Sequence, residues 1–155
     1  PVDALVVYNY PYKVSAYYIR PCSNPQPAGA DCTAADDGGN PIPTLVRLNL
    51  VGNVLEAQSL VSGIEQMQIE YGVDTNADGN TDFYGNATQL TASQWKNVAS
   101  IRIGLAFRTD KRGSMVDTTT YALPGGFSYV PSANDQMYSR KMFTRVIQIR
   151  NRSRS

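Results

Sequence analysis

Alternation of apolar and polar residues dominates this chain and predicts β-strands. Four segments alternate in this way: 46–50, 67–73, 101–107 and 143–149. In the second, Met67, Ile69 and Tyr71 are separated by Gln68 and Glu70. Because successive side chains of a strand point to opposite faces, each segment is expected to bury one face of a sheet. Residues 4–8 and 15–20, rich in Val and Tyr, are further strand candidates, so the pattern predicts six or more strands.

Helical signals are scarce. Thr91 and Gln94 have the spacing of a capping box, which predicts a short helix over about 92–98 with Trp95 packed inward. Three segments between the predicted strands are rich in turn-forming residues: 21–43, 109–118 and 124–136. No internal repeat or linker divides the chain. We therefore expect a single domain over 1–155, of α+β class and predominantly antiparallel β.

Composition narrows the possible functions. The chain has 155 residues, of which 17% are charged and 42% apolar, as expected for a folded globular domain. A net charge of +1 argues against nucleic acid as a direct partner, and the three spaced arginines within 150–154 form only a weak basic patch. The absence of His excludes Ser-His-Asp and Cys-His catalysis, and no phosphate-binding glycine motif is present. Carboxylates could supply acid and base, but no pair is marked by its context, so we do not expect an enzyme.

An acidic loop over residues 74–82 has the spacing of a calcium-binding loop. Oxygen-bearing residues occupy loop positions 1, 3, 5, 7 and 9, and Gly79 stands at position 6, where such loops bend sharply. Position 12 is Gly85 in place of the bidentate Glu, so another ligand or water must complete the site and we expect weak binding, about 10⁻⁴ to 10⁻³ M. The alternative is a metal-free turn whose side chains cap its own backbone. The predicted ligands are the side chains of Asp74, Asn76, Asp78 and Asp82 and the backbone carbonyl of Asn80.

Cys22 and Cys32 flank a loop rich in Pro and Gly, with no pattern of regular structure. Two cysteines that enclose such a loop suggest a disulfide, which would contribute about 3 kcal/mol through loop-closure entropy. A disulfide implies an oxidising compartment such as the periplasm or the cell exterior. The alternative is two free thiols in a cytosolic protein.

Three segments together resemble the PilW-like family of type IV pilus minor pilins. They are LVSGIEQMQIEYGVD at 60–74, which leads into the acidic loop, WKNVASIRIGL at 95–105, and FTRVIQIRNR at 143–152. The first is the most specific, because a strand passes directly into the acidic loop. The resemblance covers roughly the last 100 residues of the chain.

This resemblance implies a pilin-like globular head that faces the periplasm and packs its sheet on a long N-terminal helix. In the family that helix begins with a prepilin peptidase site, anchors the subunit in the inner membrane and later joins the filament core. The present chain opens at Pro1 directly in a strand-like segment, so we expect a head that lacks this helix. A sheet face would then be exposed, or covered by another chain.

The resemblance implies a minor pilin that takes part in assembly priming and in the tip complex, and that supports adhesion, twitching motility or DNA uptake. Its expected partners are other minor pilins, the major pilin and a tip adhesin, and its expected location is the cell-surface pilus or the periplasm. One alternative is a minor pseudopilin of type II secretion. Another is a calcium-dependent carbohydrate-binding module, with clustered tyrosines as the stacking platform: Tyr8, Tyr10, Tyr12, Tyr17 and Tyr18.

Overall fold

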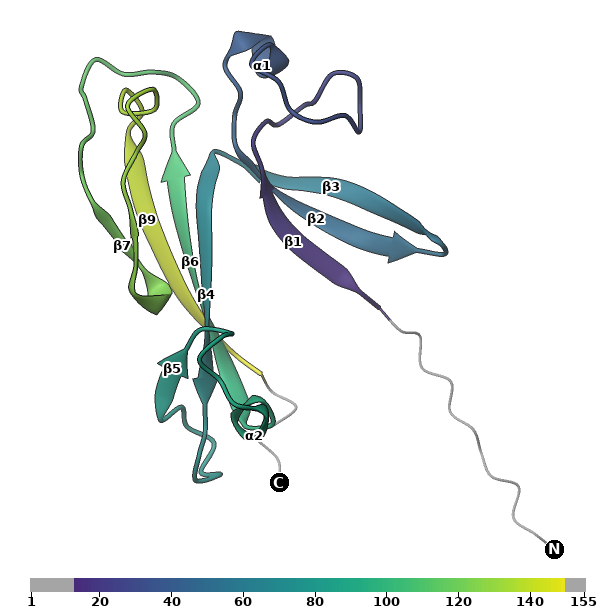
Figure 1. Ribbon diagram of the computed structural model, residues 1–155, viewed down its shortest axis with the longest axis vertical. Coiled ribbons are helices and arrows are strands. Elements are labelled where there is room, and N and C mark those ends of the chain that lie inside the picture. The colour runs from purple at the N-terminus through teal and green to yellow at the C-terminus, as the bar shows by residue number, and fades with distance from the viewer. Residues whose placement is uncertain (1–12, 150–155) are drawn as a thin grey trace, which may run out of the picture.

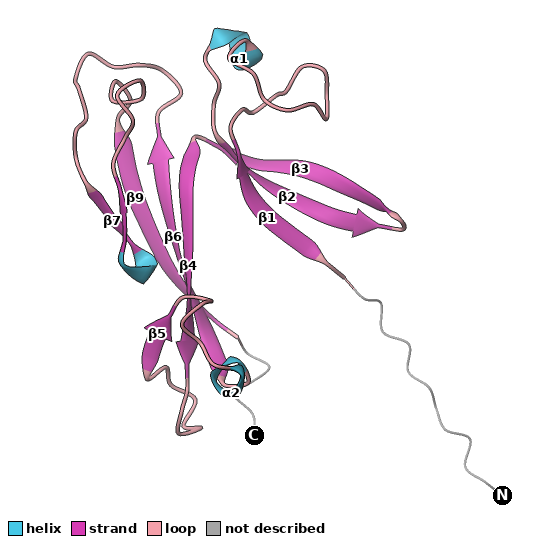
Figure 2. Cartoon of the chain, viewed as in Figure 1, coloured by secondary structure: helices cyan, strands magenta, loops and turns pink. Residues whose placement is uncertain are grey.

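The computed structural model describes residues 13–149, and the regular secondary structure of this part of the chain is mostly antiparallel β-sheet (Figure 2). The strands are β1 Ser15–Arg20, β2 Thr44–Val51, β3 Val54–Ser62, β4 Ile64–Val73, β5 Phe83–Gly85, β6 Val98–Arg108, β7 Tyr121–Leu123, β8 Phe127–Tyr129 and β9 Arg140–Gln148. The helical elements are α1 Asp36–Gly39, α2 Ala92–Trp95 and the 3-10 turn η1 Pro124–Gly126. The prediction of a predominantly antiparallel β fold is confirmed.

The strands form two main sheets and a small ribbon. Sheet A has the order β1-β2-β3, sheet B has the order β5-β4-β6-β9, and β7 pairs with β8. In Figure 1 the β2–β3 hairpin of sheet A projects away from sheet B. The ribbon and η1 contact β4, β6 and β9, so they lie over one side of sheet B.

The two sheets are joined at Gly63, a single residue between β3 and β4. Its φ is +79°, and a Cβ there would lie 2.7 Å from the carbonyl oxygen of Arg108, so glycine fits where a larger residue would clash. Val46 of β2 and Ile64 of β4 are fully buried. Sheets A and B are therefore connected by a tight turn, with buried apolar side chains on the strands either side of it.

The four alternating segments and residues 15–20 lie in strands of the structure, except that β9 ends at Gln148, one residue before the end of the predicted segment. The predicted helix is shorter than expected, because the chain turns after Trp95 and Val98 already begins β6 opposite Val73. The strands β3, β5, β7 and β8 were not predicted, and β8 lies within the turn-rich segment 124–136. The pairing of β3 with β2 slips by one residue at Leu60, which interrupts a simple alternation, and the other three strands have only three residues each. The strand candidate at 4–8 and the basic tail at 150–154 lie outside the described residues.

Candidate functional site

One face of sheet B, here called the open face, is apolar and incompletely covered. Strand pairing places its side chains in three cross-strand rows, because opposite residues of antiparallel strands share a face. The rows are Met67–Leu105–Phe143, Ile69–Ile103–Arg145 and Tyr71–Ile101–Ile147. Phe143 and Ile147, on the outer strand β9, are 44% and 52% exposed.

Burial along β6 is the reverse of what its sequence predicts. The small or polar side of the strand is buried: Ser100, Ala106 and Arg108 are 3%, 0% and 8% exposed. The apolar side is only half-buried, at Ile101, Ile103, Leu105 and Phe107. Burying apolar surface contributes about 25 cal/mol of free energy per Å² removed from water. A sheet that exposes its more apolar face therefore has a surface suited to a further partner.

The opposite face, here called the covered face, is closed by η1 and the β7–β8 ribbon. A Cβ at Gly104 would clash with the ring of Pro124, so the turn lies directly on the β6 backbone. Leu123 is 6% exposed beside it. Glycine at 104 is thus required by close packing of η1 on the sheet.

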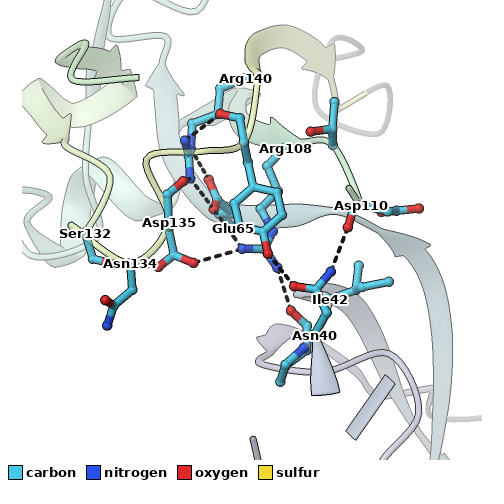
Figure 3. A network of polar contacts seen from close by, with 12 residues as sticks. Asn40, Ile42, Glu65, Arg108, Asp110, Ser132, Asn134, Asp135 and Arg140 are labelled. Carbon is cyan, nitrogen blue, oxygen red and sulfur yellow. Dashed lines mark hydrogen bonds and ion pairs between the residues drawn. The ribbon is translucent and has the colours of Figure 1, made fainter. Parts of the chain in front are cut away.

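A buried ion-pair network holds the long loop between β6 and β9 to the covered face (Figure 3). Arg140 donates two hydrogen bonds to the carboxylate of Glu65, at 2.6 and 2.8 Å, and a third at 3.2 Å to Asp117. The side chain of Arg140 is 0% exposed and that of Glu65 is 6% exposed. Arg108 pairs with Asp135 at 3.0 Å and lies over the ring of Tyr138, 4.0 Å from its centre. The buried charges are therefore paired, as burial demands.

The same network shifts the titration of two neighbouring groups. Burial, reinforced by the negative charge of Glu65, raises the pKa of Tyr129 to about 12. Burial also raises the pKa of Asp117, but hydrogen bonds, first among them that of the Tyr121 hydroxyl, outweigh it and leave the pKa below its usual value. Both shifts favour the protonation states that the ion pairs need at neutral pH.

The segment around α2 closes the open face at the C-terminal end of β4, here called the lower end. The capping box is present: Thr91 accepts from the backbone of Gln94, whose side chain accepts from the Thr91 amide. The ring of Trp95 meets that of Tyr71 edge to face, with centroids 4.5 Å apart. Trp95 nevertheless stays 39% exposed, so its inward packing is partial. This end of sheet B also holds a core cluster of Val73, Leu90 and Val98.

The acidic loop leaves the end of β4 and is ordered by its own side chains. Asp74 accepts from the amides of Ala77 and Gly79, at 2.7 and 2.8 Å. Gly79 has φ +87° and Ala77 has φ +63°, so both residues of the bend adopt the left-handed conformation. Asp82 accepts from the amide and hydroxyl of Thr75, and these bonds lower its pKa. The sharp bend expected at Gly79 is present.

The loop offers the oxygen ligands that Ca²⁺ prefers, and several of them accept hydrogen bonds from the loop's own backbone. Asn76 and Asp78 each accept a backbone amide two residues on, at 3.0 and 2.8 Å. Among the described residues, one group of three Cys, Asp or Glu side chains has ligand atoms within 4.8 Å of one another: Cys22, Cys32 and Asp36. The carboxylates of Asp74, Asp78 and Asp82 therefore do not all lie within 4.8 Å of one another. A bound ion would replace some of these internal hydrogen bonds. Calcium binding and the assignment of all five ligands stay predictions.

The predicted disulfide between Cys22 and Cys32 is present, with Cα atoms 5.6 Å apart. Two aspartates brace the same loop. Asp36, 2% exposed, accepts from the amides of Gln26 and Thr33, at 2.9 and 2.6 Å. Asp37 accepts from three backbone amides and the Ser23 hydroxyl; burial raises its pKa, but these bonds outweigh burial and lower it. The segment predicted to be irregular is therefore firmly fixed.

Of the clustered tyrosines, Tyr17 and Tyr18 lie in the described residues, whereas Tyr8, Tyr10 and Tyr12 do not. Tyr17 and Tyr18 are consecutive in β1 and are 51% and 39% exposed. Consecutive side chains of a strand point to opposite faces, so these two do not share one stacking surface.

The fold and the open face define a class: an antiparallel β domain with an apolar sheet face that its described residues leave partly open. None of the helices in residues 13–149 has the length and apolar character needed to cross a membrane. The family model of type IV pilus-assembly protein W matches residues 17–151, so the chain belongs to the PilW family. No curated protein and no solved structure matches it. Family membership assigns it a role in type IV pilus assembly, which implies association with other pilus components and fits a periplasmic or pilus location.

Proposed function

We propose that the described domain is a pilin-like head and that its open face is the seat of a long, apolar N-terminal helix of the full-length protein. The observation that carries this proposal is the reversed burial of β6, whose apolar side faces outward. A straight helix presents an apolar stripe that matches these three rows, which are apolar except for Arg145 on the outer strand β9. The rows extend over β4, β6 and β9, which gives the helix a bed three strands wide.

In this proposal the subunit is a minor pilin that acts in assembly priming and in the tip complex. It would act by protein–protein association, with other minor pilins, the major pilin and a tip adhesin as neighbours. The family match supports the pilus interpretation over the pseudopilin and carbohydrate-binding alternatives. The helix would anchor the subunit in the inner membrane before assembly, and adhesion and twitching motility would follow from the assembled pilus.

The open face is tested by a matched pair of substitutions in the full-length protein. Ile147 and Val146 are neighbours on β9, each 52% exposed, and their side chains point to opposite faces. Ile147→Lys places a charge under the helix and should reduce surface pili and twitching at least tenfold, whereas Val146→Lys should leave both near the parental level. Equal effects of the two substitutions would contradict the proposal.

We also propose that the acidic loop binds Ca²⁺ and that the ion stiffens the end of β4. Asp74, Asn76, Asp78 and Asp82 would supply side-chain oxygens, and Asn80 its carbonyl. The observations in favour are the bend at Gly79 and the anchored ends: the Asp82 amide donates to the Val73 carbonyl at 2.9 Å. Such weak binding suits structural occupancy outside the cell.

Thermal unfolding with and without Ca²⁺ tests this site. At 10 mM Ca²⁺, about 10 to 100 times the expected Kd, mass action should add about 1.4 to 2.7 kcal/mol and raise the Tm by about 5 °C. Asp78→Ala should abolish that rise, while Asp110→Ala, which removes an exposed carboxylate outside the loop, should retain it. If Ca²⁺ left the parental Tm unchanged, or if both variants responded to Ca²⁺ equally, the site would be ruled out.

A further inference from the structure

Within residues 13–149, the strand β3 is a sheet edge that lacks the usual protection against pairing with another chain. Edge strands are normally short, charged or covered. In sheet B, β5 has three residues and β9 carries Arg140, Lys141 and Arg145. On the other side of sheet A, β1 is followed by Pro21 and contacts β4. By contrast, β3 has nine residues, all exposed, and Glu56 is its one charge.

The chemistry of this edge fits an extended strand. Alternate residues of an edge strand direct their amide and carbonyl groups away from the sheet, where another strand can bond to them. The side chains differ between the two faces of sheet A. Cross-strand pairs on one face are Leu50–Leu55 and Leu48–Ala57, and those on the other are Val51–Val54, Asn49–Glu56 and Arg47–Gln58. Along residues 55–58, a partner strand must therefore match an apolar face and a polar face.

We propose that the occupant is β3 of a second copy of this chain, paired antiparallel with Ala57 on the two-fold axis. An axis at Glu56 would set two carboxylates opposite each other, which is unfavourable. An axis at Gln58 would extend the pairing across the irregularity at Leu60. With the axis at Ala57, Glu56 faces Gln58 and Leu55 faces Ser59, so neither problem arises.

The resulting dimer joins two three-stranded sheets into one of six strands. The apolar pairs of sheet A then form one continuous surface across the axis, with Leu50, Leu55 and Ala57 contributed by each copy. The pairing involves about five residues of each strand, so the interface is small and we expect a Kd on the order of 10⁻⁴ M. This surface lies on sheet A and does not depend on the function proposed above.

Single-cysteine crosslinking of the 155-residue chain tests the register. Cys22 and Cys32 are bonded to each other, so an added thiol is the one free thiol in the chain. Under mild oxidation, at a protein concentration about equal to the Kd, Ala57→Cys should form a covalent dimer readily. Val54→Cys, on the same strand and 62% exposed, should stay at least tenfold less crosslinked, because its copy would lie about 20 Å away. Equal crosslinking of the two variants would overturn the register.

Sedimentation equilibrium tests the surface itself. The parent should form more dimer as its concentration rises. Gln58→Glu should weaken the dimer about three- to tenfold, because the new carboxylate would face Glu56 of the other copy. The fold should be kept, because Arg47, which donates to Gln58 at 2.6 Å, can also pair with Glu. Ile147→Lys, on the open face of sheet B, should leave dimerisation unchanged. A parent that remains monomeric several-fold above 10⁻⁴ M, or a dimer lost in Ile147→Lys but kept in Gln58→Glu, would overturn the proposal.

Discussion

The two faces of sheet B solve the problem of burial in opposite ways. The covered face has small and polar residues, and it is closed within the chain by η1, the β7–β8 ribbon and a buried ion-pair network. The open face has the more apolar side chains, yet the described residues cover it only in part. Trp95 contacts Tyr71 at one end, and Ile64 is fully buried at the other. The comparison teaches that the more apolar face is the one left open, which is the basis of the proposed helix seat, while charges hold the domain's own loop in place.

The largest expected effect is the loss of the buried ion pair on the covered face. Glu65→Ala leaves Arg140, whose side chain is 0% exposed, without its bidentate partner, so unfolding free energy should fall by about 3–5 kcal/mol. Glu56→Ala, which removes an exposed carboxylate of β3, should change it by less than about 0.5 kcal/mol. Urea denaturation measures both. Similar small losses would mean that the network does not hold the covered face.

A smaller effect is expected where η1 lies on the sheet. Gly104→Ala introduces a Cβ against Pro124, and the overpacking should cost about 1–3 kcal/mol in urea denaturation. Gly113→Ala is the matched control, because its Cβ would make only an ordinary contact, 3.6 Å from the Met137 carbonyl oxygen. If Gly104→Ala were as stable as Gly113→Ala, the close packing of η1 on β6 would be wrong.

The smallest effect concerns alkaline pH. The pKa of Tyr129 is about 12 in the folded chain and 10.0 in the reference state, so the unfolded chain releases this proton first. The contribution of Tyr129 to the free energy of unfolding is therefore fully present below pH 10 and is lost as the pH rises toward 12. Tyr129→Phe should flatten that decline in denaturation curves taken across this window. An unchanged slope in the variant would assign the decline to other groups.

Alternation predicted the three long strands of sheet B, β4, β6 and β9, because it directly reports side chains on two faces, but it did not predict the three-residue strand β5. It did not reveal which face is covered: Ile103 and Gly104 alternate regardless of what packs on them. The ion-pair network was missed because Glu65 and Arg140 lie 75 positions apart, although arginines placed within strands, such as Arg108 and Arg140, were an available signal. Similarly, β3 was missed because a bulge at Leu60 breaks its period.

The loops divide in the same manner. The disulfide and the bend at Gly79 could be predicted, since both depend on residues close in sequence. The hydrogen bonds by which Asp36 and Asp37 brace the disulfide loop could not be predicted, because the sequence shows these two residues only as members of a turn-rich segment. Local chemistry was predictable, whereas the partners of a side chain across the fold were not.

The most direct test of the central claim is thiol labelling of Ile147→Cys and Val146→Cys, in the 155-residue chain and in the full-length protein within assembled pili. Both positions are 52% exposed, so a maleimide should label both variants at similar rates in the chain alone. In the pilus we predict that Val146→Cys stays reactive and Ile147→Cys becomes at least tenfold slower to label. Equal labelling of the two in assembled pili would contradict the assignment of the open face.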